Sequence, residues 1–312
     1  MMAIKTIKLT KIFRKGVRRK CVESLKGLTL EVKRGEIFGF IGANGAGKST
    51  TIKILMGLLK PTQGEAWLLD EPVNDCKSRV RVGYLSEHPV FYGHATPKEL
   101  LRLFGRIRGL KESYIKDRSK ELLTLLSLDE AEGRPIKGLS KGMTQRLGIA
   151  AALFHDPELI IMDEPMSGLD PLGRHVVGTL MRTLREAGKT IFFSTHIIPD
   201  IENLCDRLGI LVEGELKYVG SINEALYPLH ANMELTFLLP QLPSPKMDVF
   251  SSCPVVWQRD RLMRIEVKEG EFSSVTDQIK MAGGKILRLE PQKRSLEDIF
   301  LDVTQSGENC GT

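Results

Sequence analysis

Short apolar runs of strand length alternate with segments of helical periodicity over residues 1–225. Strands that are buried on both faces of a parallel sheet give continuous apolar runs of this kind, and the intervening helices cover the sheet. The pattern therefore predicts an α/β fold with a mostly parallel core sheet. Its predicted strands are 36–41, 80–85, 159–164 and 190–194, and a hairpin follows at 208–212 and 216–219.

Two other regions interrupt this alternation. A small antiparallel β subdomain is predicted by segments rich in β-branched residues at 4–13 and 28–33, and the apolar segment 67–69 continues its sheet. A helical insert is predicted over about 88–155, where Thr96-Pro97-Lys98-Glu99 combines a capping box with proline in the first turn. The last helix of this insert runs through Phe154 and stops before Pro157.

The pattern changes again after about Ala225. The proline-rich stretch Leu239–Pro245 predicts a connector. Beyond it, a small α+β domain is predicted from strands at 262–267 and 285–289 and helices at 272–281 and 295–303. The sequence therefore predicts two domains, 1–225 and 226–312.

Net charge, cysteine spacing and the length of apolar runs exclude some kinds of site and partner but do not identify a function. The net charge of +6 permits contact with anionic lipid or nucleic acid without requiring it. The five cysteines show no C-x-x-C spacing, which argues against a zinc site and for reduced thiols. The N-terminus has no apolar signal core, and no run approaches the ~18 apolar residues that span a bilayer. We therefore expect a chain that does not itself cross a membrane.

The strongest motif follows the predicted strand at 36–41, where Gly42 to Ser49 reads G-x-x-x-x-G-K-S. Loop glycines let backbone N–H groups turn toward a phosphate, and the helix that follows adds a partial positive charge. We expect Lys48 to reach the β- and γ-phosphates and the Ser49 hydroxyl to ligate Mg²⁺. A glycine-rich turn without a ligand is the alternative. The residues expected to bind the nucleotide here are Gly42, Asn44, Gly45, Ala46, Gly47, Lys48, Ser49 and Thr50.

Two further signals follow predicted strands of the core sheet. The run at 159–162 leads into Asp163 and Glu164, and ligands bind at the carboxyl edge of such a sheet. Asp163 is suited to hold Mg²⁺, and Glu164 to polarise the attacking water. His196 follows the next strand, where it can contact the γ-phosphate and hold Glu164 and the water. A surface acidic pair and a packed histidine are the alternatives.

A second phosphate-type site is predicted at Leu139-Ser140-Lys141-Gly142-Met143, where a serine hydroxyl and free N–H groups open a helix. A single chain could not close both sites on one nucleotide. This suggests a dimer with the nucleotide between two chains.

In their order, these motifs resemble those of the ATP-binding, or nucleotide-binding, subunit of ABC transporters, and the resemblance covers about residues 4–225. It implies a P-loop NTPase cassette that hydrolyses ATP with Mg²⁺. It also implies a head-to-tail dimer with a second cassette, either an identical chain or a paralogue. Ser140 and Gly142 would then act on the ATP of the other chain. The residues that would act within their own chain are Lys48, Ser49, Asp163, Glu164 and His196.

The resemblance assigns three more positions. Ser167 to Asp170 matches the D-loop, which couples the two sites. Phe13 stands where the family places an aromatic ring under adenine, and Glu87 stands where it has a glutamine near Mg²⁺. The family's usual Leu-Ser-Gly-Gly-Gln is also changed, with Lys141 and Met143 replacing glycine and glutamine.

The resemblance implies a transporter subunit at the inner face of the cell membrane, cytoplasmic and bound to a separate transmembrane permease. Segments 84–89 and 294–301 are similar to an exporter subset with a C-terminal extension, which favours export. An importer ATPase is the nearest alternative. A soluble ATPase acting on ribosomes or nucleic acid is less favoured. It rests on the basic cluster Arg14, Lys15, Arg18, Arg19 and Lys20.

Overall fold

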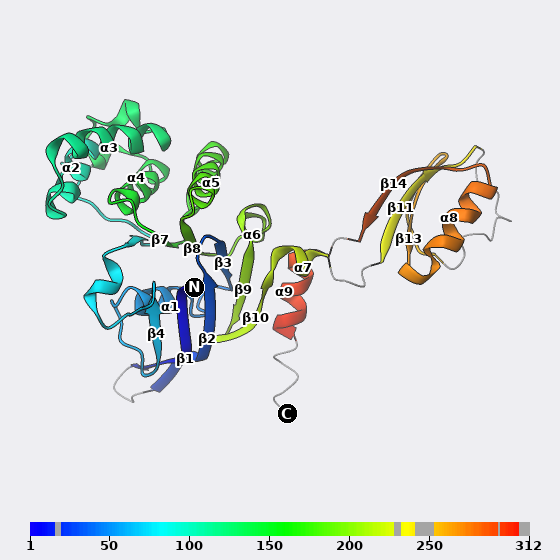
Figure 1. Ribbon diagram of the computed structural model, residues 1–312, viewed down its shortest axis with the longest axis horizontal. Helices are drawn as coiled ribbons and strands as arrows, with labels where there is room; N and C mark the ends of the chain where they lie inside the picture. Colours follow the sequence, from blue (N-terminus) through cyan, green and yellow to red (C-terminus); the bar gives the residue numbers. More distant parts are fainter. Residues whose placement is uncertain (16–19, 228–231, 241–252, 293, 306–312) are drawn as a thin grey trace. The chain divides into compact units, whose positions relative to one another are not determined.

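The computed structural model describes residues 1–15, 20–227, 232–240, 253–292 and 294–305. The described chain falls into two compact units, Met1–Ser221 and Ile222–Gln305, and Figure 1 labels their elements. Of the basic cluster, Arg18 and Arg19 lie outside the described residues, and Arg14 is exposed. Within the described ranges, no helix combines the length and the apolar character needed to span a bilayer.

The core of the first unit is a six-stranded sheet with the order β10-β9-β3-β8-β7-β6. Neighbouring strands run parallel except for the β9–β10 hairpin. All residues of the three central strands β3, β8 and β7 are buried, which explains their apolar runs. The predicted parallel sheet is confirmed. The strands are β3 (Ile37–Ile41), β6 (Val82–Leu85), β7 (Leu159–Asp163), β8 (Thr190–Thr195), β9 (Arg207–Val212) and β10 (Glu215–Ser221).

Strand register brings the ends of the central strands together. Ile41 of β3 pairs with Thr195 of β8, and Ser194 of β8 pairs with Asp163 of β7. The segments that follow these three strands therefore leave the sheet side by side at one edge. This edge positions the candidate site.

An antiparallel sheet of order β2-β1-β4-β5 packs beside the core sheet, as predicted. The two sheets and α1 share one hydrophobic cluster, in which the rings of Phe38 and Phe192 stack with centroids 5.8 Å apart. The first two strands have 14 residues each and are longer than the sequence predicts. The elements are β1 (Met2–Lys15), β2 (Lys20–Lys33), α1 (Lys48–Leu55), β4 (Gln63–Leu68) and β5 (Glu71–Pro72).

The helical insert consists of α2 (Pro97–Ile107), α3 (Glu112–Leu125) and α4 (Lys141–Leu153), which contact one another. Figure 1 shows these helices as a group beside the edge of the sheet. The predicted capping box is present, since Thr96 accepts the Glu99 N–H and Glu99 accepts the Thr96 N–H. Strand β6 begins two residues later than predicted, because a 3₁₀ turn at Cys76–Arg79 ends at Val80.

Two further helices pack against the core strands. The first, α5 (Pro171–Glu186), follows β7, and the second, α6 (Ile198–Leu204), follows β8. The sequence predicts the first of these helices, because Asp170-Pro171 marks a helix start and Gly188 a helix end, but it does not predict α6. The latter has seven residues, too few for a periodic pattern to stand out.

The second unit contains an antiparallel sheet of order β12-β13-β11-β14, with α8 packed against it. Strands β11 and β12 escape prediction. Because β11 precedes the proline-rich stretch, that stretch lies inside the unit, and its residues from 241 on lie outside the described residues. The elements are α7 (Ile222–Leu226), β11 (Met233–Leu238), β12 (Val255–Arg259), β13 (Leu262–Val267), α8 (Phe272–Met281), β14 (Lys285–Pro291) and α9 (Leu296–Gln305).

Candidate functional site

The loop between β3 and α1 has the geometry of an anion-binding loop. Gly45 and Gly47 have φ of +84° and +112°, in the left-handed region that favours glycine. A Cβ on Gly47 would also lie 2.6 Å from the Ser24 carbonyl oxygen, so the site admits no side chain. Gly47 is the N-cap of α1 and makes no side-chain cap. The first turn of α1 therefore keeps N–H groups open to an anion.

Lys48 lies over this loop and is almost fully buried. Its Nζ donates to the Gly42 carbonyl at 2.7 Å and to the Ala43 carbonyl at 3.3 Å. It also lies 3.7 Å from Oε1 of Glu164, and the two side chains are only 6% and 8% exposed. A buried cation of this kind is favoured where negative charge is bound.

Glu164 is held in place by hydrogen bonds to its backbone from three directions. Its N–H donates to the Ser194 hydroxyl at 3.1 Å. Its carbonyl accepts from Gln145 Nε2 at 3.3 Å and from the Ser167 N–H at 3.1 Å. Its φ is +50°, uncommon for a residue with a side chain. Strained backbone of this kind persists where the surroundings over-determine it, and functional sites are where it collects.

The carboxylates of Glu164 and Asp163 have separate partners. Oε2 of Glu164 lies 3.0 Å from Nδ1 of His196. Oδ1 of Asp163 accepts a 2.5 Å hydrogen bond from the Ser194 hydroxyl. Ser194 thus links both acidic residues to β8, and the structure brings Lys48, Asp163, Glu164 and His196 together at the edge expected from the sequence.

A cavity of about 590 Å³ opens over the loop, within the size range of ligand sites. Phe13 and Glu87 both line it, from β1 and from the segment after β6. Lys11 Nζ lies 5.2 Å from the centre of the Phe13 ring. The Glu87 side chain is half-exposed, and its Oε1 lies 3.7 Å from Nε2 of His88. The other lining residues are Val22, Ser24, Ala43, Asn44, Gly45, Gly47, Lys48, Ser49, Thr50 and Glu164.

The oxygen atoms of Ser49, Asp163 and Glu87 are the kind of donor that Mg²⁺ prefers. Within the described residues, no group of three or more His, Cys, Asp or Glu could hold a metal ion by itself. Mg²⁺ commonly binds through one or two carboxylates together with substrate phosphates. Ser49 and Glu87 line the cavity, whereas Asp163 is buried and is not among its described lining residues. The chemistry of these oxygen donors fits Mg²⁺ that arrives with a nucleotide.

The second motif lies apart from this cavity. Ser140 is the N-cap of α4, and its hydroxyl accepts the Met143 N–H at 3.1 Å. Neither Ser140 nor Gly142 is among the described residues that line the cavity. One chain therefore does not bring its two phosphate-type motifs together.

The segment Ser167–Asp170 lies between the two motifs. It begins at the hydrogen bond from the Ser167 N–H to the Glu164 carbonyl, and it ends where Asp170 caps α5 by accepting the Gly173 N–H at 2.9 Å. A Cβ on Gly168 would lie 2.9 Å from Cδ of Lys141, so the Lys141 stem packs on this segment. The unusual lysine thus has a packing role within its own chain.

Sequence reasoning missed two residues that hold Glu164. Gln145 is 2% exposed within α4, and Ser194 is 0% exposed within β8. A polar side chain buried among apolar neighbours needs a hydrogen-bond partner. Ser194 directly follows the apolar run Ile191–Phe193, and that contrast was the available signal. Gln145 stands between Thr144 and Arg146, so its sequence neighbours give no such contrast.

A family model described as "ABC transporter" matches residues 25–167. An uncharacterized ABC transporter ATP-binding protein of Nostoc sp. is 38% identical over 307 residues, which are 97% of this chain and 90% of that protein. The bacitracin transport ATP-binding protein BcrA of Bacillus licheniformis is 34% identical over 97% of this chain and 98% of its own. The Nod factor export ATP-binding protein I of Rhizobium sp. is 34% identical over 93% of this chain and 95% of its own.

Solved structures agree with these relatives. The structure of an ATP-binding subunit of an ABC transporter is 33% identical, with a TM-score of 0.64 over 72% of this chain and 92% of its own. A dimeric, post-hydrolysis structure of the cassette MJ0796, bound to ADP and Pi, is 27% identical, with a TM-score of 0.65 over 70% of this chain and 98% of its own. Since the relatives match along nearly the whole chain, this protein belongs to the ATP-binding proteins of ABC transporters and is the ATPase subunit of such a transporter.

Proposed function

We propose that the chain binds ATP with Mg²⁺ in the cavity over the β3–α1 loop, and that its hydrolysis there drives an exporter. The observation that carries the proposal is the position of Glu164. Its carboxylate lies 3.7 Å from the Lys48 ammonium and 3.0 Å from Nδ1 of His196. A carboxylate in this position can accept a proton from a water molecule that attacks a phosphate held by Lys48.

The chain's own residues divide the work. The β3–α1 loop and Lys48 hold the phosphates, with Lys48 exchanging its two carbonyl partners for phosphate oxygens. Glu164 orients and deprotonates the water, and His196 holds the Glu164 carboxylate. Mg²⁺, when bound by Ser49, Asp163 and Glu87, supplies positive charge that offsets the charge on the phosphates. Phe13, which lines the cavity, provides a ring for the base.

ATP binding closes two chains head to tail in this proposal. Ser140 and Gly142 of one chain then face the γ-phosphate held by the other. Their distance from the cavity within one chain supports this arrangement, and so does the dimeric structure of a similar cassette. Ser167 to Asp170 would couple the two sites, because this segment is bonded to Glu164 and packs on Lys141.

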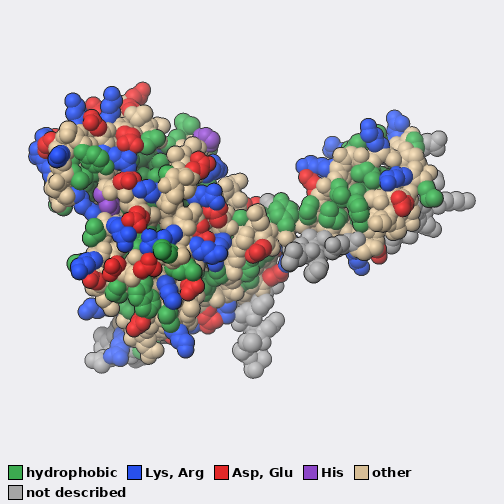
Figure 2. Space-filling model, in the orientation of Figure 1, with side chains coloured by type: hydrophobic (Ala, Val, Ile, Leu, Met, Phe, Trp, Pro, Cys, Tyr) green, Lys and Arg blue, Asp and Glu red, His purple; other side chains and the backbone are tan. Residues whose placement is uncertain are grey.

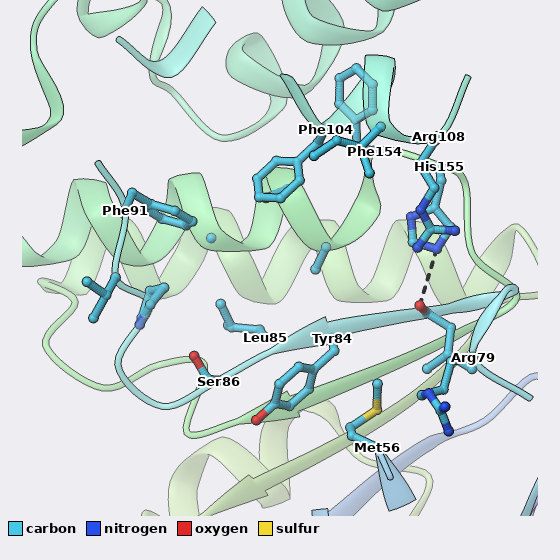
Figure 3. Close-up of a pocket in the computed structure, with 17 residues that line it drawn as sticks. Met56, Arg79, Tyr84, Leu85, Ser86, Phe91, Phe104, Arg108, Phe154 and His155 are labelled. Carbon is cyan, nitrogen blue, oxygen red and sulfur yellow. Dashed lines mark hydrogen bonds between the residues drawn. The ribbon is translucent and has the colours of Figure 1, made fainter. Parts of the chain in front are cut away.

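A groove of about 360 Å³ between β6 and the helical insert is the proposed docking surface for a separate permease. Figure 3 shows Phe91 toward one end of this groove and Arg108 with His155 at the other. Val90 also lines the groove and is 89% exposed. Ser86 lines the groove and the next residue, Glu87, lines the nucleotide cavity. Movement at one site can therefore reach the other through adjacent residues.

Export is favoured over import by the relatives. Similarity to a Nod factor export protein extends over 93% of this chain. An importer subunit would differ in its partner rather than in this chemistry. On the face of the described residues in Figure 2, Lys and Arg side chains are interspersed with Asp and Glu. A continuous basic surface is typical of nucleic-acid binding, and this face does not have one. We propose that the partner is a permease and that the chain lies at the inner side of the membrane.

The permease proposal is tested by purifying the tagged chain from native membranes in mild detergent. We expect a multi-span membrane protein in stoichiometric amount, and we expect Val90→Glu to lower its recovery at least about tenfold, because a charge is forced into an apolar contact. Met281→Glu is the matched control, since Met281 is 90% exposed in the second unit. Recovery of ribosomes or DNA in place of a membrane protein would contradict the proposal.

A further inference from the structure

The helices that follow Glu164 and His196 are joined by a second pair of charged residues. Arg174 lies in the first turn of α5, and Asp200 lies in α6, four residues after His196. Nη1 of Arg174 is 3.7 Å from Oδ1 of Asp200. The segments that carry Glu164 and His196 are therefore linked by two contacts. One is between Glu164 and His196, and the other is between Arg174 and Asp200.

Helix α6 depends on such contacts for its position. It has seven residues, and its N-cap, Ile197, makes no side-chain cap. A helix this short is not stable by itself and is held by tertiary packing. Its apolar anchor is Ile201, which is fully buried over Gly39 of β3. The Arg174–Asp200 pair is a polar anchor one residue away.

Asp200 is an unusual choice for a purely structural contact. Its side chain is 11% exposed, and its Oδ2 is buried without a hydrogen-bond partner in the described structure. Burial raises the pKa of Asp200, and the negative charge of Glu164 adds to this, while the charges of Arg174 and His196 oppose it. The carboxylate lies on the wall of a cavity that His175 and Arg182 also line. An asparagine or an apolar residue would be easier to bury there.

We propose that Asp200 and Arg174 are positioning residues for hydrolysis: their ion pair fixes the start of α6 and thereby keeps the His196 ring on the Glu164 carboxylate. The His196 side chain is 47% exposed, so packing alone does not hold the ring. Loss of the pair lets α6 shift, and His196 leaves Glu164. This inference rests on the function proposed above, because it concerns the same two catalytic groups.

The test is steady-state hydrolysis of Mg·ATP by the full chain with Asp200→Asn, which keeps the shape and removes the charge. We expect kcat to fall about tenfold with KM for ATP within about twofold, because small misplacements of reacting groups lower turnover and leave binding intact. Arg174→Lys should retain more turnover than Arg174→Ala. Glu186→Gln, the same chemical change at an exposed position of α5, is the control and should match the parent chain.

A double-mutant cycle separates positioning from general stability. Asp200 acts through His196 in this proposal, so Asp200→Asn should have no further effect on kcat in a His196→Ala background. A full tenfold fall in that background, or unchanged kcat in the single variant, overturns the proposal.

The pH profile gives an independent readout. Protonation of Asp200 breaks the pair, and its raised pKa moves this loss to a higher pH than for an ordinary aspartate. Turnover of the parent chain should therefore decline on the acid side through this step, and Asp200→Asn should lack the step. An acid limb identical in both proteins would contradict the proposal. If Glu164→Gln abolishes turnover while Asp200→Asn does not, only this inference fails; if Glu164→Gln leaves turnover intact, the proposed function fails.

Discussion

The N-termini of α1 and α4 both have the features of a phosphate site, yet their N-cap residues and their surroundings differ. At α1 the N-cap is Gly47, which makes no side-chain cap, and a cavity surrounds it with Lys48 and Glu164. At α4 the N-cap is Ser140, whose hydroxyl is engaged by the Met143 N–H, outside the described lining of that cavity. One end has a buried cation and a carboxylate at hand, and the other has neither among its described contacts. This difference supports our proposal that the α4 end is half of a site that a second chain completes.

Among changes at these two helix ends, the largest effect on ATP affinity is expected from Lys48→Ala. The variant removes the buried cation from the α1 end and leaves the α4 end unchanged. Charge-assisted hydrogen bonds contribute about 1.5–3 kcal/mol, so ATP affinity should fall about 10- to 100-fold. Equilibrium binding of a fluorescent ATP analogue measures this. Unchanged affinity would remove the α1 end from nucleotide binding.

A change at the α4 end should separate binding from turnover. Ser140→Arg places a bulky side chain where the second chain's nucleotide would approach. We expect turnover to fall at least about tenfold while the affinity of the isolated chain for ATP stays within about twofold. Light scattering with ATP should show loss of the dimer. If the ATP affinity of the isolated chain falls as much as turnover does, both helix ends belong to one site within a single chain. That result would contradict the proposed division between the α1 and α4 ends.

The smallest effect is expected from Ser140→Ala. Loss of an N-cap hydroxyl lowers the free energy of unfolding by about 1 kcal/mol. The free energy of unfolding is measured by denaturant titration. A Gly47→Ala comparison sharpens the result, because its Cβ would meet the Ser24 carbonyl and should destabilise more. Equal destabilisation by the two substitutions would contradict the conclusion that, of these two positions, only Gly47 lacks room for a side chain.

The sequence was sufficient for features that lie within one local stretch. The β3–α1 loop, the Asp163-Glu164 pair and the capping box at Thr96 are each complete within a few residues. The meeting of the loop and the acidic pair at one sheet edge was also predictable, because parallel strands end together.

Features that depend on distant residues were not predictable. Gln145 reaches Glu164 across 19 positions, and Ser194 reaches it across 30. Strand β12 is a short edge strand with mostly exposed residues, so its pattern carries little of the alternation that marks a strand. Helix α6 is fixed by packing on β3 and by Arg174 rather than by its own propensity.

The role of Glu164 in hydrolysis is tested by measuring ATP turnover of Glu164→Gln, with ATP affinity measured on the same protein. We expect turnover to fall at least about 100-fold, because the group that accepts the proton of the attacking water is lost. Affinity should remain within about threefold, since Lys48 and the β3–α1 loop are intact. Glu186→Gln should leave both quantities unchanged. Near-normal turnover in Glu164→Gln would contradict the proposal that this carboxylate carries out hydrolysis, with its backbone held by Ser194 and Gln145 and its Oε2 beside His196.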